Sequence, residues 1–552
     1  MMSKQWLLIT SMLLLSLCLY LGIQSWEKRK LKEKIRKEWG IHPRGTRFDK
    51  EESLKAAWLN YEEQHPSDFK IDDITWNDLD MARVFELLNN TKSSLGAENL
   101  YRLLRSFAND SKGVAEFQEY LDFYEGDDQA RSKIQYVLAK IGKRDRNQLT
   151  VYLNQPQANK LGNPWLYYCL GVAPLVLLGA LIISQNSLFL LGLIANVVTN
   201  SIVYLIKKQQ LERELLSMSY LVNMIALAKE ASQVSHPCQG ELKELSKKLK
   251  TVGKLGFIFR FKSGSESEMF LEYLNILFMV PLISYNVVIN KISTFQNEAL
   301  RLAEILGKTD SAIAVLNFKK IMPYTSPPSF ATEGGISSQG MYHPLLSQAV
   351  ANEVQWHKTT LVTGSNASGK STYLKAVAIN GILAQTIGLT CSRSWQMKPG
   401  AVLSSMALED SLFEGDSYFV AEIKSVKRII EKVKGQETCY CFVDEILRGT
   451  NTVERISASS AIVNWLRASQ SLAFIATHDI ELTELLKDHC ENIHFSETVT
   501  EDQGVTFDYV LRHGPAKSRN AIQLLGVMAY PKSIIAEAEN RAQHFEKTRK
   551  WQ

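Results

Sequence analysis

A loop near the middle of the chain has the residue types and spacing that bind phosphate. Residues 364–372 read GSNASGKST, which fits the pattern G-x-x-x-x-G-K-[ST]. In such a loop the backbone amides point at phosphate oxygens, the lysine reaches the β- and γ-phosphates, and the next hydroxyl ligates Mg²⁺. An apolar strand at 359–363 and a helix from about Tyr373 give the loop its context. The predicted ATP contacts are Gly364, Ser365, Asn366, Ala367, Ser368, Gly369, Lys370, Ser371 and Thr372, with Ser371 as a magnesium ligand.

Two further apolar segments end in residues suited to phosphoryl chemistry. The strand predicted at 439–443 ends in Asp444 and Glu445, where one carboxylate would hold Mg²⁺ and the next would polarise the attacking water. The strand predicted at 472–476 leads to His478, which would sense the γ-phosphate or position water; a purely structural histidine is the alternative. Ligands of parallel sheets gather at the carboxyl ends of the strands. We therefore predict Asp444 as a metal ligand and Glu445 and His478 as catalytic residues.

Positioning these residues requires an α/β domain with a parallel sheet, of the P-loop NTPase type, which we assign to 326–552. With 552 residues, 45% of them hydrophobic and 22% charged, the chain is long enough for several folded domains. The residues before 326 have helical patterns and predict an all-α core in two parts, 78–160 and 207–325, preceded by basic linker helices at 27–77. Cys439 and Cys441 alternate along a strand, as buried thiols do, and no zinc or disulfide pattern is present in the sequence.

The positive charge of the chain is concentrated in one short segment. Residues 28–37 hold seven basic residues and one glutamate, a net charge of +6, whereas the whole chain carries +5. The rest of the chain therefore sums to −1. A protein built mainly to neutralise phosphates spreads lysine and arginine over its surface, so the overall charge does not favour DNA binding.

Two uncharged stretches predict membrane insertion. Residues 5–26 are rich in leucine and are followed by the basic segment, so we expect an N-terminal span (1–26) with its basic end inside; a cleaved signal peptide is the alternative. Residues 161–206 are long enough for two spans, 165–183 and 188–206, separated by a polar break. Their outer ends are basic, which predicts a hairpin in a multi-pass protein of the cell membrane with a cytoplasmic ATPase domain. A buried hairpin of a soluble domain is the alternative.

A third uncharged stretch, 273–290, is only just long enough to span a bilayer and carries Asn275, Pro281, Asn286 and Asn290. We predict a buried or amphipathic core helix here. A further span would also place the ATPase domain outside the cell, where there is little ATP.

The motifs together resemble the MutS family, the clade that includes the mismatch-repair ATPases. The similar segments are 362–374 around the phosphate loop, His343, Pro344, Leu345 and Asn352 before it, 410–412, 415–419 and Glu422 after it, 444–451, 477–479 and 518–526. A weaker likeness to the start of the family's lever domain covers 84–89, Thr91, Gly96, Leu100 and Leu103. The resemblance implies that Ser417 reaches the nucleotide of a partner subunit, and hence a homodimer through the ATPase heads.

The chain also departs from the family pattern. Leu447 stands where mismatch-repair members usually carry glycine, and only about 70 residues precede the lever-like region, too few for a mismatch-reading domain. The predicted membrane hairpin interrupts that region broadly where relatives carry their DNA clamp.

These features leave two functions open. One is a membrane-anchored, mismatch-repair-related ATPase that binds DNA between its levers. The other is a nucleotide-gated membrane scaffold or switch that never contacts DNA. A transporter is a more distant alternative, because three spans per chain provide a thin pathway even in a dimer.

Overall fold

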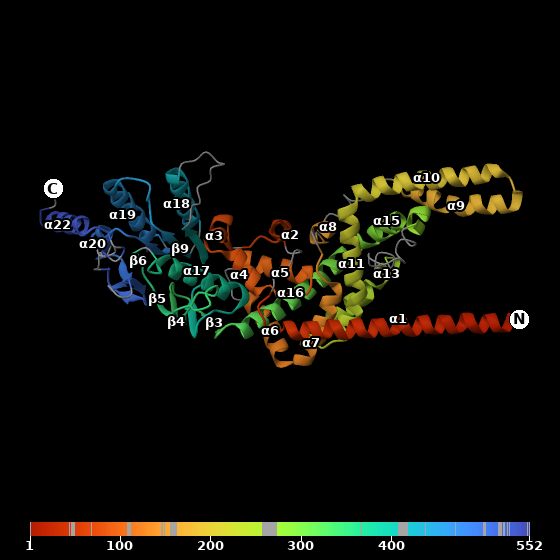
Figure 1. Cartoon of the computed structure of the whole chain (residues 1–552), viewed down its shortest axis with the longest axis horizontal. Helices are drawn as coiled ribbons and strands as arrows, with labels where there is room; N and C mark the ends of the chain where they lie inside the picture. The colour runs from red at the N-terminus through yellow and green to blue at the C-terminus, as the bar shows by residue number, and fades with distance from the viewer. Residues whose placement is uncertain are drawn as a thin grey trace. The chain divides into compact units, whose positions relative to one another are not determined.

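The chain folds into two compact units in the computed structural model (Figure 1). The helical unit comprises residues 1–66, 86–102 and 117–321, and the head unit comprises 67–85, 103–116 and 322–552. The structure describes residues 2–43, 45, 50–67, 69–107, 112–144, 147, 149–154, 163–256, 273–365, 367–406, 418–435, 438–469, 471–500, 504–516, 522, 525–526, 528, 530–548 and 550.

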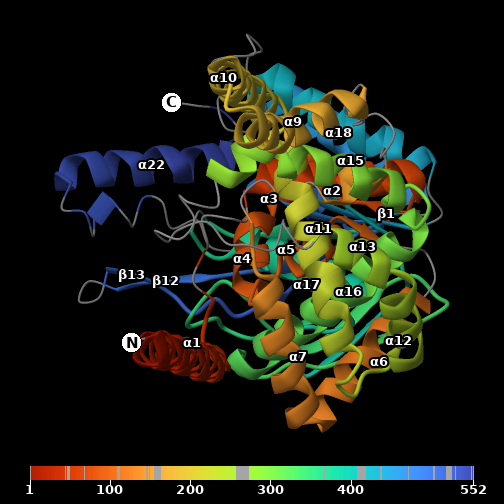
Figure 2. The same ribbon diagram turned by 90° about the vertical axis from the view of Figure 1, so that its right-hand side faces the viewer.

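The helical unit consists of helices of different lengths that run in several directions and pack against one another (Figure 2). Helix α16 (Gln296–Ile321) is buried along much of its length and forms the centre of this unit. The other helices are α1 (Met2–Glu38), α2 (Glu51–Gln64), α5 (Ser94–Arg105), α6 (Lys112–Gly126), α7 (Asp128–Ile141), α8 (Leu149–Asn154), α9 (Pro164–Ser184), α10 (Ser187–Gln210), α11 (Glu212–Ala231), α12 (Gln239–Lys248), α13 (Lys250–Leu255) and α15 (Val280–Ile292).

A buried carboxylate organises the start of α5. Asp310 of α16 accepts hydrogen bonds from the backbone N–H of Lys92 (3.0 Å) and Ser93 (2.7 Å) and from Ser93 Oγ (2.6 Å). A β-carbon on Gly96 would lie 2.4 Å from Asp310 Oδ2, so only glycine fits there. Asp310 thus fixes the two residues that precede α5, and the first amides of this helix donate to Tyr220 Oη and Ser93 Oγ. The glycine that the sequence comparison singled out thus has a packing role.

Helices α9 and α10 form an antiparallel hairpin of apolar residues (Figure 1). Both are long and apolar enough to cross a membrane, and only 17% and 11% of the residues in their most apolar windows are buried. Their bounds agree with the predicted segments 165–183 and 188–206. At the root of the hairpin, Asn200 Nδ2 donates to the carbonyl oxygens of Leu170 (3.0 Å) and Leu277 (2.7 Å).

The other two uncharged stretches are also helical. The segment 5–26 lies within the continuous helix α1, although most of its first 20 side chains lie outside the described residues. Within 273–290, helix α15 buries Leu282, Tyr285 and Val288, so the prediction of a buried core helix is confirmed for this part.

The head unit is built on a six-stranded sheet in the order β14-β11-β6-β10-β9-β8. Its strands run parallel except for β14, which is antiparallel to β11. The strands are β6 (Thr360–Thr363), β8 (Ala401–Ser405), β9 (Cys439–Asp444), β10 (Ser471–Ala476), β11 (Glu491–His494) and β14 (Arg512–His513), and the helices of the head are α17 (Lys370–Ile387), α18 (Tyr418–Lys434), α19 (Thr452–Ala468), α20 (Ile480–Leu485) and α22 (Lys532–Thr548).

A second, mostly antiparallel sheet in the head was not predicted. It has the order β3-β7-β4-β5, and a hairpin of β12 and β13 lies beyond it in the sequence. These strands are β3 (Pro328–Phe330), β4 (Ile336–Met341), β5 (Asn352–Trp356), β7 (Ser394–Met397), β12 (Glu497–Thr500) and β13 (Gly504–Phe507). Strands β5 and β7 alternate between exposed and buried residues, but they are too short for this pattern to stand out in the sequence, and β4 has a shifted register between Ser338 and Met341. The head therefore has mixed sheets rather than one parallel sheet.

The head also recruits residues from far upstream. The short helix α3 (Asp73–Asp78) packs on β8, where Ser404 Oγ donates to Asp78 Oδ2 (2.7 Å) and Arg428 forms an ion pair with Asp72. Strand β1 (Phe69–Lys70) pairs with β2 (Ser106–Phe107), and α4 (Met81–Leu88) follows α3. The compact units therefore interleave along the chain, unlike the contiguous segments predicted from the sequence.

Candidate functional site

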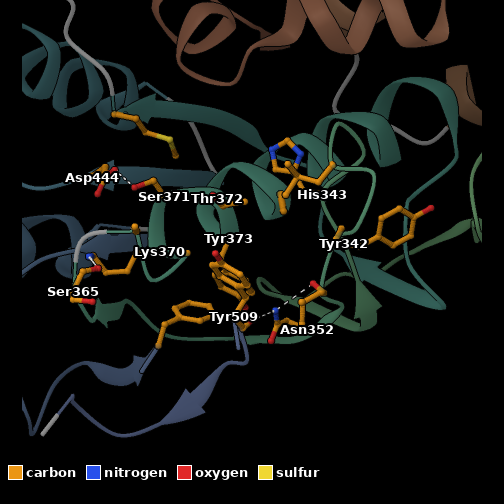
Figure 3. A pocket seen from close by; sticks show the side chains of 18 of the residues that line it. Tyr342, His343, Asn352, Ser365, Lys370, Ser371, Thr372, Tyr373, Asp444 and Tyr509 are labelled. Atoms are coloured by element: carbon orange, nitrogen blue, oxygen red, sulfur yellow. Dashed lines mark hydrogen bonds between the residues drawn. The ribbon is translucent and has the colours of Figure 1, made fainter. Parts of the chain in front are cut away.

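The phosphate loop connects β6 to α17 and has the backbone that its glycines allow. Gly364 and Gly369 have φ values of 144° and 107°, and a β-carbon on Gly364 would lie 2.6 Å from the carbonyl oxygen of Phe495. Ala367 has a φ of 64°, which is unusual for a residue other than glycine. The loop borders a pocket of about 550 Å³ that is lined by residues of the head alone (Figure 3).

Lys370 points back across the loop. Its Nζ donates to the carbonyl oxygens of Gly364 and Ser365, both at 2.8 Å, and the side chain is almost fully buried. Burial lowers the pKa of Lys370, although the nearby carboxylates of Asp444 and Glu445 oppose this shift. A cation held by neutral carbonyl groups in a buried loop is suited to receive an anionic ligand.

Ser371 and Asp444 meet at the edge of the sheet. The Ser371 hydroxyl donates to Asp444 Oδ2, and the two side chains lie together on one side of the pocket (Figure 3). Burial raises the pKa of Asp444, while the hydrogen bond from Ser371 opposes this shift. A hydroxyl and a partly buried carboxylate are oxygen ligands of the kind that Mg²⁺ prefers, and a cation would relieve the unfavourable burial of the carboxylate. These residues therefore fit a magnesium ion.

Glu445 is held from two sides. His478 Nε2 lies 3.0 Å from Glu445 Oε1, and Arg448 Nε lies 3.1 Å from Oε2. The hydrogen bond with His478 is the main cause that lowers the pKa of Glu445, and the charge of Arg448 adds to it. The glutamate therefore remains ionised at neutral pH, as a residue that accepts a proton from water must be.

The sheet register explains why these residues meet. Strands β9 and β10 are parallel neighbours in which Asp444 is paired with Ala476, so Glu445 and His478 emerge at the same edge. The backbone N–H of Glu445 donates to the carbonyl oxygen of Ala476 (2.9 Å). The parallel pairing of the strands therefore explains why the three predicted segments converge. Asn366 and Ser417, two of the predicted contacts, lie outside the described residues, as do Asp410 and 517–521.

Several residues of the site had no predicted role. Tyr509 lines the pocket, and its Cδ1 lies 3.1 Å from where a β-carbon on Gly369 would be. Asn352 fixes this segment, because its Nδ2 donates to Tyr509 O (2.9 Å) and its Oδ1 accepts from Leu511 N (2.8 Å). A lone tyrosine in a loop gives no sequence signal, whereas Asn352 belongs to a recognisable motif. His343, another pocket residue, is buried, which lowers its pKa to about 4.

Helix α18, which follows residues 407–417, contacts the loop after β9. Glu422 is buried, and its Oε1 accepts from the backbone N–H of Arg448 (3.0 Å). A β-carbon on Gly449 would lie 3.1 Å from Phe419 Cβ. Leu447 has a φ of 58° and is 8% exposed, so a buried leucine adopts a left-handed backbone conformation that favours glycine.

The matches to known proteins fall on this part of the chain. A family model described as MutS domain V matches residues 360–546. The C-terminal domain belongs to the MutS family. A curated DNA mismatch repair protein MutS from Pseudothermotoga lettingae is 28% identical over 265 residues, which cover 46% of this chain and 32% of that protein. The chain thus spans about a third of the length of this relative. The MutS-type domain contains the phosphate loop, Asp444, Glu445 and His478, and the match supports an ATP-binding role for the head.

Proposed function

We propose that the head binds and hydrolyses ATP. The observation that carries this proposal is the convergence of Lys370, the Ser371–Asp444 pair and the Glu445–His478 pair on one pocket. The spacing of residues in the sequence predicts the phosphate loop. It does not require that a carboxylate held by a histidine lie at the same edge of the sheet. Phosphoryl transfer depends mainly on positioning and charge stabilisation, which such a constellation provides.

Each side chain has a distinct role in the proposed reaction. Lys370 leaves the loop carbonyls and binds the β- and γ-phosphates. Ser371 and Asp444 would hold Mg²⁺, which would neutralise phosphate charge. Glu445 orients the attacking water and accepts its proton. His478 keeps Glu445 in place and lies next to the γ-phosphate.

Turnover by the purified full chain tests this site. Replacing Lys370 by alanine is expected to lower ATP hydrolysis at least a hundredfold, because the phosphates lose the cation of the phosphate loop. Lys358→Ala is the matched control, because Lys358 is an exposed lysine of the same domain and lies outside the pocket lining. Hydrolysis that survives Lys370→Ala would overturn the site assignment.

We further propose that the active form is a homodimer of heads in which Ser417 of one subunit contacts the nucleotide of the other. This proposal rests on the resemblance of 415–419 to the MutS signature. ATP is expected to increase the dimer fraction in light scattering, and Ser417→Ala is expected to abolish this increase. A monomer at all ATP concentrations would contradict it.

We also propose that α9, α10 and the apolar half of α1 cross the cell membrane and leave the head in the cytoplasm. The support is that both hairpin helices expose most of their apolar residues, whereas core helices of soluble proteins bury them. In addition, α1 and the hairpin extend from the same end of the helical unit (Figure 1). The full chain is expected to stay in membranes after alkaline carbonate extraction. Release into the soluble fraction would exclude these spans.

We favour a nucleotide-gated membrane switch as the purpose of hydrolysis, because the chain outside residues 28–37 is nearly neutral and because the hairpin is anchored in the helical unit through Asn200. A membrane-tethered, mismatch-repair-related ATPase that binds DNA is the second candidate, supported by the relative's name. Duplex DNA is expected to leave turnover unchanged for the switch. Stimulation by DNA that weakens with salt would favour the second candidate.

A further inference from the structure

Helix α1 passes without a break from an uncharged segment into a basic one. Its residues 28–37 continue the axis of residues 5–26, so the charges cannot turn away from the end of the apolar segment. At 1.5 Å per residue, Lys28, Arg29 and Lys30 lie within about 3–6 Å of Trp26 along the axis. All four side chains are exposed.

The basic segment has two halves with different surroundings. In the distal half, Lys34 pairs with Glu38 (3.8 Å) and Lys37 pairs with Glu33 (2.7 Å). Ile35 in this half is buried. The exposed Lys32 lies between the halves, with its Nζ 5.5 Å from the centre of the Tyr136 ring in α7, a helix that contacts α1. The distal half is therefore engaged in contacts within the helical unit.

The proximal half has no such carboxylate partners. Within the described part of the chain no ion pair involves Lys28, Arg29 or Lys30, and Glu27 is the only acidic residue in the same turn. Lys30 Nζ lies 4.8 Å from the centre of the Trp26 ring. A tryptophan followed one turn later by a lysine places the ring at the level of the headgroups and the ammonium group just beyond it.

The second membrane-facing element repeats this arrangement. In α10, Lys208 Nζ lies 5.5 Å from the centre of the Tyr204 ring, again four residues apart at the end of an apolar segment. Lys207 precedes it and bonds Gln210 Oε1 (3.0 Å). Both apolar elements thus end in an aromatic residue followed by a lysine, although Trp26 is exposed and Tyr204 is buried.

We propose that Lys28, Arg29 and Lys30 form a binding site for the headgroups of anionic phospholipids, with Lys208 as a second contact point on α10. This proposal rests on the proposed membrane insertion and adds a selectivity for anionic lipids. Juxtamembrane clusters of lysine and arginine attract anionic lipids, and the attraction falls off within a Debye length of about 8–10 Å. The distal basic residues, at about 12–17 Å from Trp26, lie beyond this range.

Electron spin resonance of the full chain in phosphatidylcholine vesicles tests the site. The probes are spin-labelled phosphatidylglycerol and spin-labelled phosphatidylcholine, and the measurement is the fraction of each that is motionally restricted by the protein. At about 0.15 M salt, where the Debye length is about 8 Å, we expect at least about a fivefold preference for phosphatidylglycerol, which falls as salt is raised further. Substituting Lys28, Arg29 and Lys30 together by glutamine is expected to remove most of this preference.

The matched control replaces Lys34, Arg36 and Lys37 by glutamine, which changes the net charge by the same amount but farther from the bilayer. The control is expected to keep the preference. Equal restriction of both lipids by the unmodified chain, or equal losses in the two triple variants, would overturn the proposed site. If neither lipid is restricted, the chain has not inserted, and the proposed membrane spans fail instead.

Discussion

The two units use the same kinds of residue for different purposes. In the helical unit, the buried carboxylate of Asp310 receives three hydrogen bonds from fixed donors, and His236 lies between Thr309 Oγ1 (2.7 Å) and the backbone N–H of Cys238 (2.9 Å). In the head, Asp444 has one hydroxyl partner at a pocket, and His478 lies beside a glutamate at the same pocket.

The difference separates structural from functional polar groups. A buried group whose hydrogen bonds are supplied by fixed parts of the fold has no capacity left for a ligand. Asp444 and Glu445 instead face a cavity and are held by side chains that can exchange partners. Residue type alone does not distinguish Asp310 from Asp444. The fully buried Asp310 differs from the partly buried Asp444 in its exposure and in the number and the origin of its donors.

The largest effect is expected at Asp444. Asp444→Asn is expected to lower ATP turnover about a thousandfold, because a magnesium ligand is lost. Thermal stability at neutral pH is expected to stay the same or rise slightly. Burial raises the pKa of Asp444, so its ionisation costs stability as pH rises through that range, and an amide avoids this cost. If Asp444→Asn were less stable but kept its turnover, Asp444 would be a structural residue rather than a functional one.

Asp310→Asn is expected to show the opposite pattern. The amide can no longer accept from all the donors at the start of α5, so we expect a loss of about 3 kcal/mol in the free energy of unfolding of the helical unit. Urea titration monitored by circular dichroism measures this loss, and ATP affinity of the folded variant serves as the control. An unchanged midpoint would show that the Asp310 cluster is not structural.

His236 predicts a pH dependence of stability. Burial lowers its pKa to about 4 in the folded state, against 6.5 for a free histidine. The unfolded chain therefore binds more protons between these values, and stability falls as the pH is lowered from about 6.5 to 4. We expect a loss of about 2.5 kcal/mol from this group. In the His236→Gln variant this part of the pH dependence should disappear from melting curves recorded at both limits; an unchanged curve would argue against it.

The smallest effect concerns the strained loop after Asp444. Leu447 has a positive φ. Glycine adopts a positive φ without strain, whereas alanine is strained there just as leucine is. We therefore expect Leu447→Gly to be more stable than Leu447→Ala by about 1 kcal/mol, the reverse of the usual order for these residues. Melting temperatures of the two variants decide this, and a more stable alanine variant would contradict the backbone assignment.

The sequence is most informative where spacing dictates geometry. The phosphate loop, the acidic strand end at Asp444 and the two hairpin helices could be predicted, because a local pattern specifies each of them. The second sheet could not, since its strands are short and irregular. Nor could the attachment of α3 to the head, because the pairing of Asp72 with Arg428 joins residues that are more than 350 positions apart.

Within the site, the candidate reactive residues are easier to recognise in the sequence than the residues that support them. Residues 364–372 and Glu445 belong to sequence patterns, whereas the contacts of Tyr509 and Glu422 are visible only in the folded chain. Leu447 was noticed as a departure from the family, and its positive φ gives that departure a physical meaning.

The most direct test of the account is to separate ATP binding from ATP hydrolysis at Glu445. Binding of ATP with Mg²⁺ and steady-state turnover would be measured on the same preparations of the full chain, of Glu445→Gln and of Glu353→Gln, an exposed glutamate of the head. We expect Glu445→Gln to bind ATP with an affinity within about threefold of the unmodified chain while its turnover falls at least about a hundredfold. Full turnover in Glu445→Gln would contradict the proposal that this glutamate, held by His478 and Arg448, activates the attacking water.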